Sequence, residues 1–393
     1  MDAMELYRAE RMEEDNFFSD NVVTKYRTAA DLANETMKTV AAACVAGRKI
    51  VDICRLGDDM ILDMTSKVFK KSGVERGIAF PTSLNINNVV KNFSPFPEDE
   101  TTLNAGDVVK IELGVHIDGY IAVLGHTVIV NPQPQTPITG RAADVVCAAH
   151  YAAEAAARIV QPGMKSHDLV EAIQRVAAAF NCRVVEGVET HLMKRYVLQA
   201  PVNTIPGQPT LESLPDDFVF EEHQAYSVNI VMTSGSGKAK SSDDPRQTLI
   251  LQRDANQTYN LKLKAARAAL SVASETFGFF PFATRTLLDM DPRHKLGLQE
   301  PLQHQILIPH STLYEDRVHE SEQVVSAQFR FTILLLPSGP LRITIGQETL
   351  PLPYVHSNYE LEPAGISELL KRQGARMVKS KLPAMKQDNS MEM

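Results

Sequence analysis

The chain has 393 residues, of which 44% are hydrophobic and 22% are charged, and its formal net charge at pH 7 is −8. These values are near the average for globular proteins, so we expect a substantial core in two domains or in one large domain with insertions. The acidic balance argues against a protein that coats nucleic acid with its whole surface. Any contact with nucleic acid must therefore come from local basic patches.

The N-terminal residues and the cysteines indicate a soluble protein of the cytoplasm or nucleus. Residues 1–20 are rich in acids and arginine, unlike a signal peptide, and we interpret them as an N-terminal extension. The chain contains no run of about 18 apolar residues, the length that a membrane span needs. The cysteines are scattered without a CxxC pair, which is typical of reduced thiols: Cys44, Cys54, Cys147 and Cys182.

Two pairs of helices are predicted, and the same short motif stands inside each pair. Apolar residues recur at helical spacing over 24–46 and again over 142–160. The motif Gly47-Arg-Lys-Ile-Val-Asp-Ile follows the first run, and Gly163-Met-Lys-Ser-His-Asp-Leu follows the second. Each motif opens another helix, over 51–71 and over 167–180, the latter with Ser166 as N-cap. β-rich sequence follows both pairs. This favours a duplicated helix–helix–strands unit, although so short a match also arises by chance.

The stretch 108–130 has the pattern of a β-hairpin. Asp118 and Gly119 lie between two β-rich runs, and an Asp-Gly pair in this position is a strong turn signal. If these are the two central turn residues, Glu112 lies opposite Gly125, and Val123 is its diagonal neighbour at about 7–8 Å. Two carboxylates at those positions could bridge a pair of divalent metals. This chain offers one carboxylate and one valine.

The last third of the chain is predicted to hold an insertion, a hairpin and a tail. The insertion spans about 253–323 and begins with a helix over 258–277, whose apolar face comprises Leu263, Ala266, Leu270, Ala273 and Phe277. The final hairpin is formed by 326–336 and 341–346 around a Pro-Ser-Gly-Pro turn. Residues 361–393 have the composition of a flexible basic tail.

Three blocks of sequence occur in the order found in one known family. They are Gly77-Ile-Ala-Phe-Pro-Thr-Ser-Leu-Asn-Ile-Asn-Asn, Gly106-Asp-Val-Val-Lys-Ile-Glu-Leu-Gly and Gln328-Phe-Arg-Phe-Thr-Ile-Leu-Leu. The chain resembles type 2 methionine aminopeptidases, and more closely their non-peptidase relatives, the proliferation-associated proteins and the fungal curved-DNA-binding protein. The resemblance implies an α/β pita-bread fold over 21–350, with two pseudo-twofold halves around a curved, mostly antiparallel sheet and a helical type 2 insertion.

The resemblance also implies a metal site that has lost most of its ligands. The enzymes hold two metals with two Asp, one His and two Glu. The first Asp falls on Glu112 and the His on His191, although a buried, hydrogen-bonded core histidine is the favoured explanation of His191. The other three ligands fall on Val123, Asn229 and Arg330, and two further family histidines fall on Asn92 and Gln199.

One carboxylate and one imidazole cannot hold a bridged metal pair. The sequence therefore predicts no catalytic residues, no metal and no cofactor, unless the alignment slips by a residue or two at several positions together. We hypothesise that Glu112 pairs with Arg330, because that pair would fill the old site without a metal. The alternative is a metal-dependent methionine aminopeptidase that removes N-terminal Met.

Four basic clusters are candidates for nucleic-acid contacts, and each can also be explained as a solvated charge run. Glycines around the second cluster would allow a close approach to phosphate, although the spacing is not that of a P-loop. The clusters are Lys67, Lys70, Lys71 and Arg76; Lys238 and Lys240 with Arg246; Lys262, Lys264 and Arg267; and Lys371, Arg372, Arg376, Lys379 and Lys381.

The resemblance implies a function in binding instead of hydrolysis. The family is known to associate with the large ribosomal subunit and rRNA, to bind structured RNA and curved DNA, and to act in ribosome biogenesis, translation and growth control. We expect cytoplasmic and nuclear or nucleolar localisation, no membrane contact, and possible protein partners at the cleft or the tail. The IxxLL spacing of Ile366, Leu369 and Leu370 fits a partner motif or, alternatively, the packing of a last helical turn. A regulator that acts on bent DNA by shape is a third reading.

Overall fold

The computed structural model of the chain describes residues 18–70, 73–131, 133, 136–210, 217–241, 249–316, 323–344, 354–361 and 365–377. Most of the expected N-terminal extension lies outside these ranges, and so do four of the basic candidates: Lys71, Arg246, Lys379 and Lys381. No helix in the described ranges combines the length and hydropathy that a membrane-spanning helix requires.

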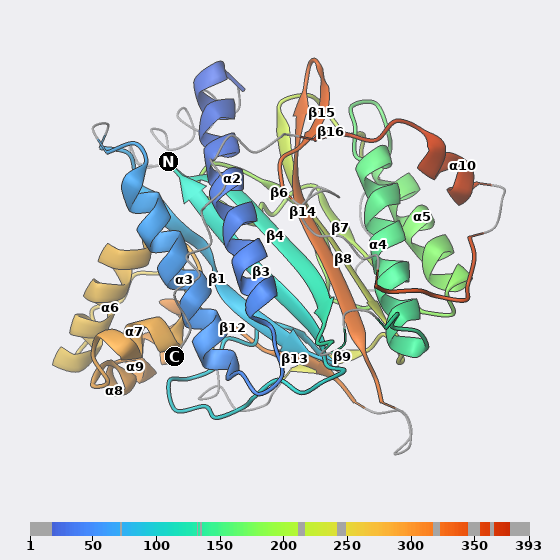
Figure 1. Cartoon of the computed structure of the whole chain (residues 1–393). Helices are drawn as coiled ribbons and strands as arrows, with labels where there is room; N and C mark the ends of the chain where they lie inside the picture. The colour runs from blue at the N-terminus through green and yellow to red at the C-terminus, as the bar shows by residue number, and fades with distance from the viewer. Residues whose placement is uncertain are drawn as a thin grey trace.

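Two similar series of elements follow one another along the chain, as the repeated motif predicts. The first series is α2 (Asp20–Ala43), α3 (Ile50–Lys67), β1 (Arg76–Ile86), β2 (Val89–Lys91), β3 (Val108–Ile117) and β4 (Tyr120–Ile129). The second is α4 (Arg141–Ile159), α5 (Ser166–Ala179), β5 (Arg183–Val184), β6 (Glu189–Met193), β7 (Thr204–Pro206) and β8 (Gln224–Thr233). Figure 1 shows that the four helices lie on one face of the sheet.

The remaining elements form the insertion, the final hairpin and a C-terminal segment. Strands β9 (Ala239–Ser241) and β10 (Ile250–Arg253) precede the insertion, which contains α6 (Lys264–Phe277), β11 (Phe282–Ala283), α7 (Thr284–Met290), α8 (His294–Gly297), α9 (Gln299–Gln303), β12 (Leu307–His310) and β13 (Leu313–Glu315). The final hairpin is β14 (Ser326–Leu336) and β15 (Gly339–Arg342), followed by α10 (Ile366–Lys371) and β16 (Arg376–Met377).

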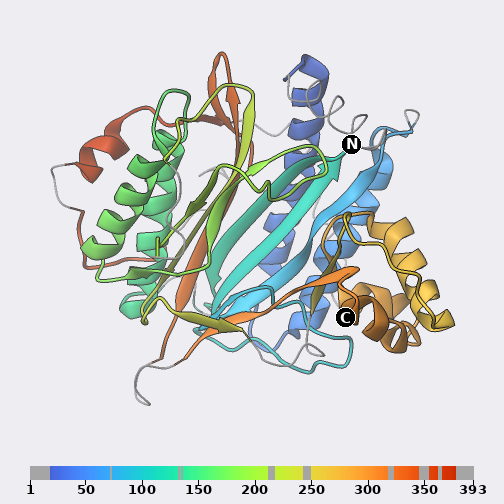
Figure 2. The same ribbon diagram turned by 180° about the vertical axis from the view of Figure 1, so that it is seen from behind.

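The main sheet joins the two series through β14. Its central order is β1-β3-β4-β14-β8-β6-β7, and each neighbouring pair on this path is antiparallel. The central strands are buried on both faces, because the helices cover one face and the other faces the insertion strands seen in Figure 2. This arrangement agrees with an α/β fold built around a mostly antiparallel sheet.

The β3–β4 hairpin has the predicted turn and register. Asp118 and Gly119 have φ angles of 56° and 77°, the left-handed values that a two-residue type I′ turn requires. Glu112 is paired with Gly125 and Gly114 with Val123, so Val123 is the diagonal neighbour of Glu112. The turn is held by Lys25 and Arg195, which donate to the two Asp118 carboxylate oxygens at 2.5 and 2.6 Å.

The insertion has a small core of its own and is attached to the main body by a buried ion pair. Leu251, Phe277 and Leu307 pack in a cluster separate from the core of the main sheet. Arg285 on α7 contacts Asp58 on α3 at 2.6 Å, and their side chains are 1% and 3% exposed. Asp58 also accepts from the backbone N–H of Thr82 at 2.7 Å, so one carboxylate links α3, β1 and α7.

Two details of the predicted helices are wrong. Ser166 is the first residue of α5 and not its N-cap, which is Lys165, and the Ser166 hydroxyl donates to Asp217. Helix α6 begins at Lys264 instead of 258, because Glu300 accepts the backbone N–H groups of Lys262 and Leu263 at 2.7 and 2.9 Å. Leu263 is consequently 54% exposed and does not belong to the buried face of α6.

The expectation of a flexible tail does not hold for residues 365–377. Ile366 on α10 is buried, and Arg376 and Met377 on β16 pair in parallel with Leu341 and Arg342 on β15. Helix α10 lies beside α4 and α5 in Figure 1. The carbonyl of Arg372 accepts from the Arg158 side chain at 3.1 Å. Leu369 and Leu370 are partly buried against the same core, so the IxxLL residues pack a helical turn and do not form an exposed partner motif.

Candidate functional site

The sheet register brings three of the predicted site positions into one row and places a fourth close to it. Glu112 on β3 is paired with Gly125 on β4, Gly125 with Arg330 on β14, and Arg330 with Asn229 on β8. His191 on β6 is paired with Ser227, two residues from Asn229 on the same strand. Successive side chains alternate between faces, so these residues share the face of the sheet that the helices leave uncovered.

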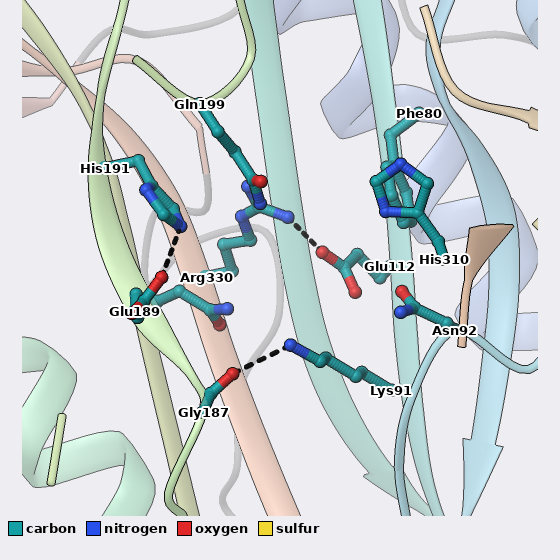
Figure 3. Close-up of a pocket in the computed structure, with 11 residues that line it drawn as sticks. Phe80, Lys91, Asn92, Glu112, Gly187, Glu189, His191, Gln199, His310 and Arg330 are labelled. Carbon is teal, nitrogen blue, oxygen red and sulfur yellow. Dashed lines mark hydrogen bonds and ion pairs between the residues drawn. The ribbon is translucent and has the colours of Figure 1, made fainter. Parts of the chain in front are cut away.

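Arg330 and Glu112 form a buried ion pair across this row, as hypothesised from the sequence (Figure 3). Each side chain is 4% exposed. The guanidinium reaches Glu112 over Gly125, where a Cβ atom would come within 3.0 Å of the Arg330 Cβ. Arg330 Nε donates to Ser227 Oγ at 2.7 Å, which fixes the guanidinium plane. A permanent cation thus neutralises the carboxylate that would otherwise be the best metal ligand of the site.

At two other expected ligand positions, the residues form hydrogen bonds within the protein. Val123 is fully buried, and its backbone N–H and C=O bond with the Thr332 hydroxyl at 3.0 and 2.9 Å. The Asn229 side-chain oxygen accepts from Gln328 Nε2 at 2.9 Å. The valine offers no donor atom, and the amide oxygen already accepts a hydrogen bond.

His191 is buried and neutral, as expected for a core histidine, although it also lines a cavity. Its Nε2 lies 3.4 Å from a Glu189 carboxylate oxygen, and its Nδ1 lies 3.4 Å from the Thr204 hydroxyl. Burial lowers the pKa of His191 to about 4, with smaller contributions from the cations Arg330 and Lys91. The imidazole is therefore uncharged at neutral pH.

Sequence reasoning missed five residues that line the same cavity: Phe80, Lys91, Gly187, Glu189 and His310. Lys91 lies on β2 and donates to the Gly187 carbonyl at 2.8 Å, which connects the two walls of the cavity in Figure 3. Burial lowers the pKa of Lys91, and it also lowers the pKa of His310, to about 4. His310 comes from the insertion, so only the tertiary fold could reveal its position. Lys91 is adjacent in sequence to the predicted Asn92, and that adjacency is a usable signal.

The two substrate-side positions face the same cavity. Asn92 donates to the Ser311 carbonyl at 3.0 Å, which ties β2 to the insertion, and Gln199 lies on the opposite wall beside Arg330 (Figure 3). The cavity has a volume of about 130 Å³. Sites for organic ligands are usually about 300 Å³ or larger. This cavity is therefore too small for a peptide in the described conformation.

The residues of this site do not fit a divalent metal pair. Such a pair needs several carboxylates, and the row offers one ion-paired carboxylate, one neutral imidazole and one engaged amide. No group of three or more His, Cys, Asp or Glu side chains arranged to hold a metal occurs among the described residues.

The backbone and glycines of the loop 234–238 pack around an internal carboxylate, and the side chain of Lys238 remains exposed. Glu315 is fully buried and accepts from Thr233 Oγ1 at 2.6 Å, Ser236 Oγ at 2.9 Å and the Gly237 N–H at 2.7 Å. A Cβ atom on Gly235 would clash with the same carboxylate. The glycine therefore permits the approach of Glu315, and Lys240 is engaged by Asp316.

The other basic candidates fall into two groups, side chains that have a partner within the structure and side chains that are exposed to solvent. Lys67 pairs with Asp63 at 2.5 Å, Arg76 donates to the Phe69 carbonyl, and Arg376 donates to Ser338, so these three have structural partners. Lys70, Lys238, Lys371 and Arg372 have exposed side chains. Near the start of α6 three exposed cations gather: Lys262, Lys264 and Arg267.

All four cysteines are free thiols in the structure, which agrees with the expectation of reduced thiols. Burial raises the pKa of the Cys44 and Cys54 thiols to about 12. These two thiols are therefore protonated and unreactive core groups.

Comparison with known proteins identifies the family. Residues 24–220 match the model of metallopeptidase family M24. The ERBB-3 binding protein 1 of Solanum tuberosum is 41% identical over 352 residues, which cover 89% of this chain and 85% of that protein. The chain belongs to metallopeptidase family M24.

Within family M24, the chain is similar to the curved DNA-binding protein, one of the relatives that the three sequence blocks indicate. The curved DNA-binding protein of Schizosaccharomyces pombe is 34% identical over 354 residues, 89% of each protein. A solved structure of a thermophilic Arx1 superposes with a TM-score of 0.82 at 25% identity and covers 92% of this chain and 100% of that chain. The architecture of this M24 protein is the pita-bread fold, and the expected relationship to methionine aminopeptidases is confirmed.

Proposed function

We propose that this M24 protein is a catalytically inactive member of its family that binds ribosomes and structured RNA. The observation that carries the proposal is the Arg330–Glu112 pair in the centre of the degenerate site. A dication placed near the guanidinium would be repelled at short range in a buried setting, where charge interactions are screened less than in water. The protein retains the fold, but most of the ligands that a two-metal reaction needs are replaced by other residues.

A surface at the start of α6 supports the binding half of the proposal. We call it the insertion patch and define it by Tyr259, Lys262, Lys264 and His304. The Tyr259 and His304 rings are stacked, with centroids 3.7 Å apart and an interplanar angle of 14°, and Tyr259 is 38% exposed. Lys262 and Lys264 are exposed, and neither side chain forms an ion pair with another described residue.

An exposed aromatic face beside exposed lysines is a suitable surface for single-stranded or looped RNA. Bases stack on aromatic side chains with about 1–3 kcal/mol per base, and lysines neutralise phosphates with release of counterions. The chain as a whole is acidic, so contact with RNA must come from local basic patches such as this one. The resemblance to the proliferation-associated proteins supports the ribosome as the partner. It also supports a role in ribosome biogenesis and growth control, with localisation in the cytoplasm and nucleus. The name of the Schizosaccharomyces pombe relative is compatible with binding to DNA by shape.

Co-sedimentation with purified ribosomes across a salt series tests the proposal. We expect the full chain to pellet with ribosomes at low salt and to be released as salt rises. The Lys262→Glu/Lys264→Glu variant should bind at least tenfold more weakly and with a shallower salt dependence. Lys49→Glu/Lys165→Glu is a charge-matched control, because both lysine side chains are exposed, lie outside the insertion and already pair with Glu100 and Asp217. Full-length protein that stays in the supernatant at low salt would contradict the proposal.

A further inference from the structure

A second cavity lies away from the degenerate site, on the other side of the glycine-rich loop. It is an open groove of about 340 Å³ between the C-terminal part of α5, strand β5 and the loop 234–238, and we call it the α5 groove. Its volume is within the range of sites for organic ligands, unlike the cavity beside Arg330. None of its lining residues belongs to the row of former metal positions.

The floor of the α5 groove is apolar and uncharged. Ala177 and Val184 are each 4% exposed, and Cys182 beside them is 7% exposed. Burial raises the pKa of the Cys182 thiol to about 11, so it is protonated at neutral pH. Ala178 is exposed at the rim and has a small side chain. A flat apolar ring could lie on this floor without burying an unpaired polar group.

The rim of the groove carries cations and neutral hydrogen-bonding groups. Arg183 and Lys238 are exposed and form no ion pair with another described residue, and one carboxylate, Glu186, lies near them. Gln174 and Gln208 provide side-chain amides from two separate elements. The rim can therefore bind an anion at one place and a heterocyclic edge at another.

The groove is pre-organised by the loop that carries Lys238. Gly237 donates to Glu315 at 2.7 Å and accepts from the Glu186 N–H at 2.8 Å, and the Lys238 N–H donates to Ser236 Oγ at 3.2 Å. A Cβ atom on Gly237 would lie 2.8 Å from the Val184 carbonyl, so the loop rests directly on β5. These contacts hold the backbones of Lys238 and Arg183 side by side without using their charged groups.

We propose that the α5 groove binds a nucleotide unit, with the base on the apolar floor and a phosphate between Arg183 and Lys238. A phosphate alone would contact neither the apolar floor nor the amides of Gln174 and Gln208, whereas a base with one ring or two can contact all of them. The unit can be a free mononucleotide or an unpaired nucleotide of an RNA, because both present the same base and phosphate. The groove is independent of the insertion patch, so either site can fail without the other.

Isothermal titration calorimetry of the full chain with AMP and with the single-stranded hexaribonucleotide A6 tests the proposal. Two variants alter the groove in different ways: Arg183→Glu/Lys238→Glu reverses the phosphate-binding charge, and Ala178→Trp fills the floor from an exposed position. We expect each to weaken binding at least tenfold. The charge-matched Lys49→Glu/Lys165→Glu variant should stay within twofold of the natural chain, since both lysine side chains are exposed, pair with Glu100 and Asp217, and lie outside the groove.

The two probes distinguish the source of the nucleotide. Binding of AMP that both groove variants weaken indicates a free nucleotide, whereas binding of A6 alone, with the same sensitivity, indicates an unpaired nucleotide of RNA. Adenosine without phosphate should bind at least tenfold more weakly than AMP. The proposal is overturned if neither probe binds, if the groove variants leave binding within twofold, or if a hexaglutamate peptide binds as tightly as A6. None of these outcomes bears on ribosome binding through the insertion patch.

Discussion

Breaking the Arg330–Glu112 pair should destabilise the protein far more than a surface pair would. Both side chains are 4% exposed, so Arg330→Met leaves a carboxylate buried without its counterion. Removal of one partner of such a pair costs about 3–5 kcal/mol, whereas replacement of both by apolar side chains is often close to neutral. We therefore expect Arg330→Met to lower the free energy of unfolding by about 3–5 kcal/mol, and the Glu112→Leu/Arg330→Met double variant to recover most of that loss.

Urea unfolding followed by circular dichroism measures these differences, because the chain has no tryptophan to report by fluorescence. Lys67→Met is the control: its partner Asp63 and Lys67 itself are each 58% exposed, so the loss should be under about 1 kcal/mol. The reasoning fails if Arg330→Met costs no more than this control. It also fails if the losses of the two single variants simply add in the double variant, because contacting partners must show a coupling energy.

Three further outcomes follow from the described contacts. The pKa of His191 is lowered to about 4 in the folded state, so the folded protein binds fewer protons than the unfolded chain between pH 4 and 6.5. The free energy of unfolding should therefore fall as the pH drops from about 6.5 towards 4. His191→Gln should make this fall smaller, by up to about 3 kcal/mol over the whole range. Glu315→Ala removes an acceptor of three donors and should cost about 3 kcal/mol or more in urea unfolding, with faster proteolysis in the loop 234–238. Truncation after Leu361 removes the buried Ile366 and the β16 pairing, so its melting temperature should be several degrees below that of the chain truncated after Met377.

The fold was predictable from sequence where local patterns were strong. The Asp118-Gly119 turn fixes the register of β3 and β4, and that register alone places Glu112 opposite Gly125. Helix ends were less predictable, because the start of α6 is decided by Glu300, a residue more than thirty positions downstream. The repeated Gly-x-Lys motif identified the two helix pairs correctly, since a glycine follows the first helix of each pair.

The candidate site was predictable only in part. The positions of Glu112, His191, Asn229 and Arg330 followed from the family resemblance, and the pair between Glu112 and Arg330 followed from their opposite charges. His310 could not be assigned, because it reaches the cavity from the insertion through β12 pairing with β10. The reason for the glycines in the loop 234–238 could not be predicted, because they pack around Glu315, which is distant in sequence and invisible to any local pattern.

The central claim is that this M24 protein lacks the chemistry of its peptidase relatives because Arg330 occupies the place of a metal ligand. The most direct measurement is release of N-terminal methionine from a methionyl peptide by purified full-length protein after addition of Co²⁺, Mn²⁺ or Zn²⁺. We predict no release above the protein-free rate with any of the three ions. Turnover that depends on added metal would contradict the ligand assignments at Val123, Asn229 and Arg330, and the protein would then be a metallo-aminopeptidase.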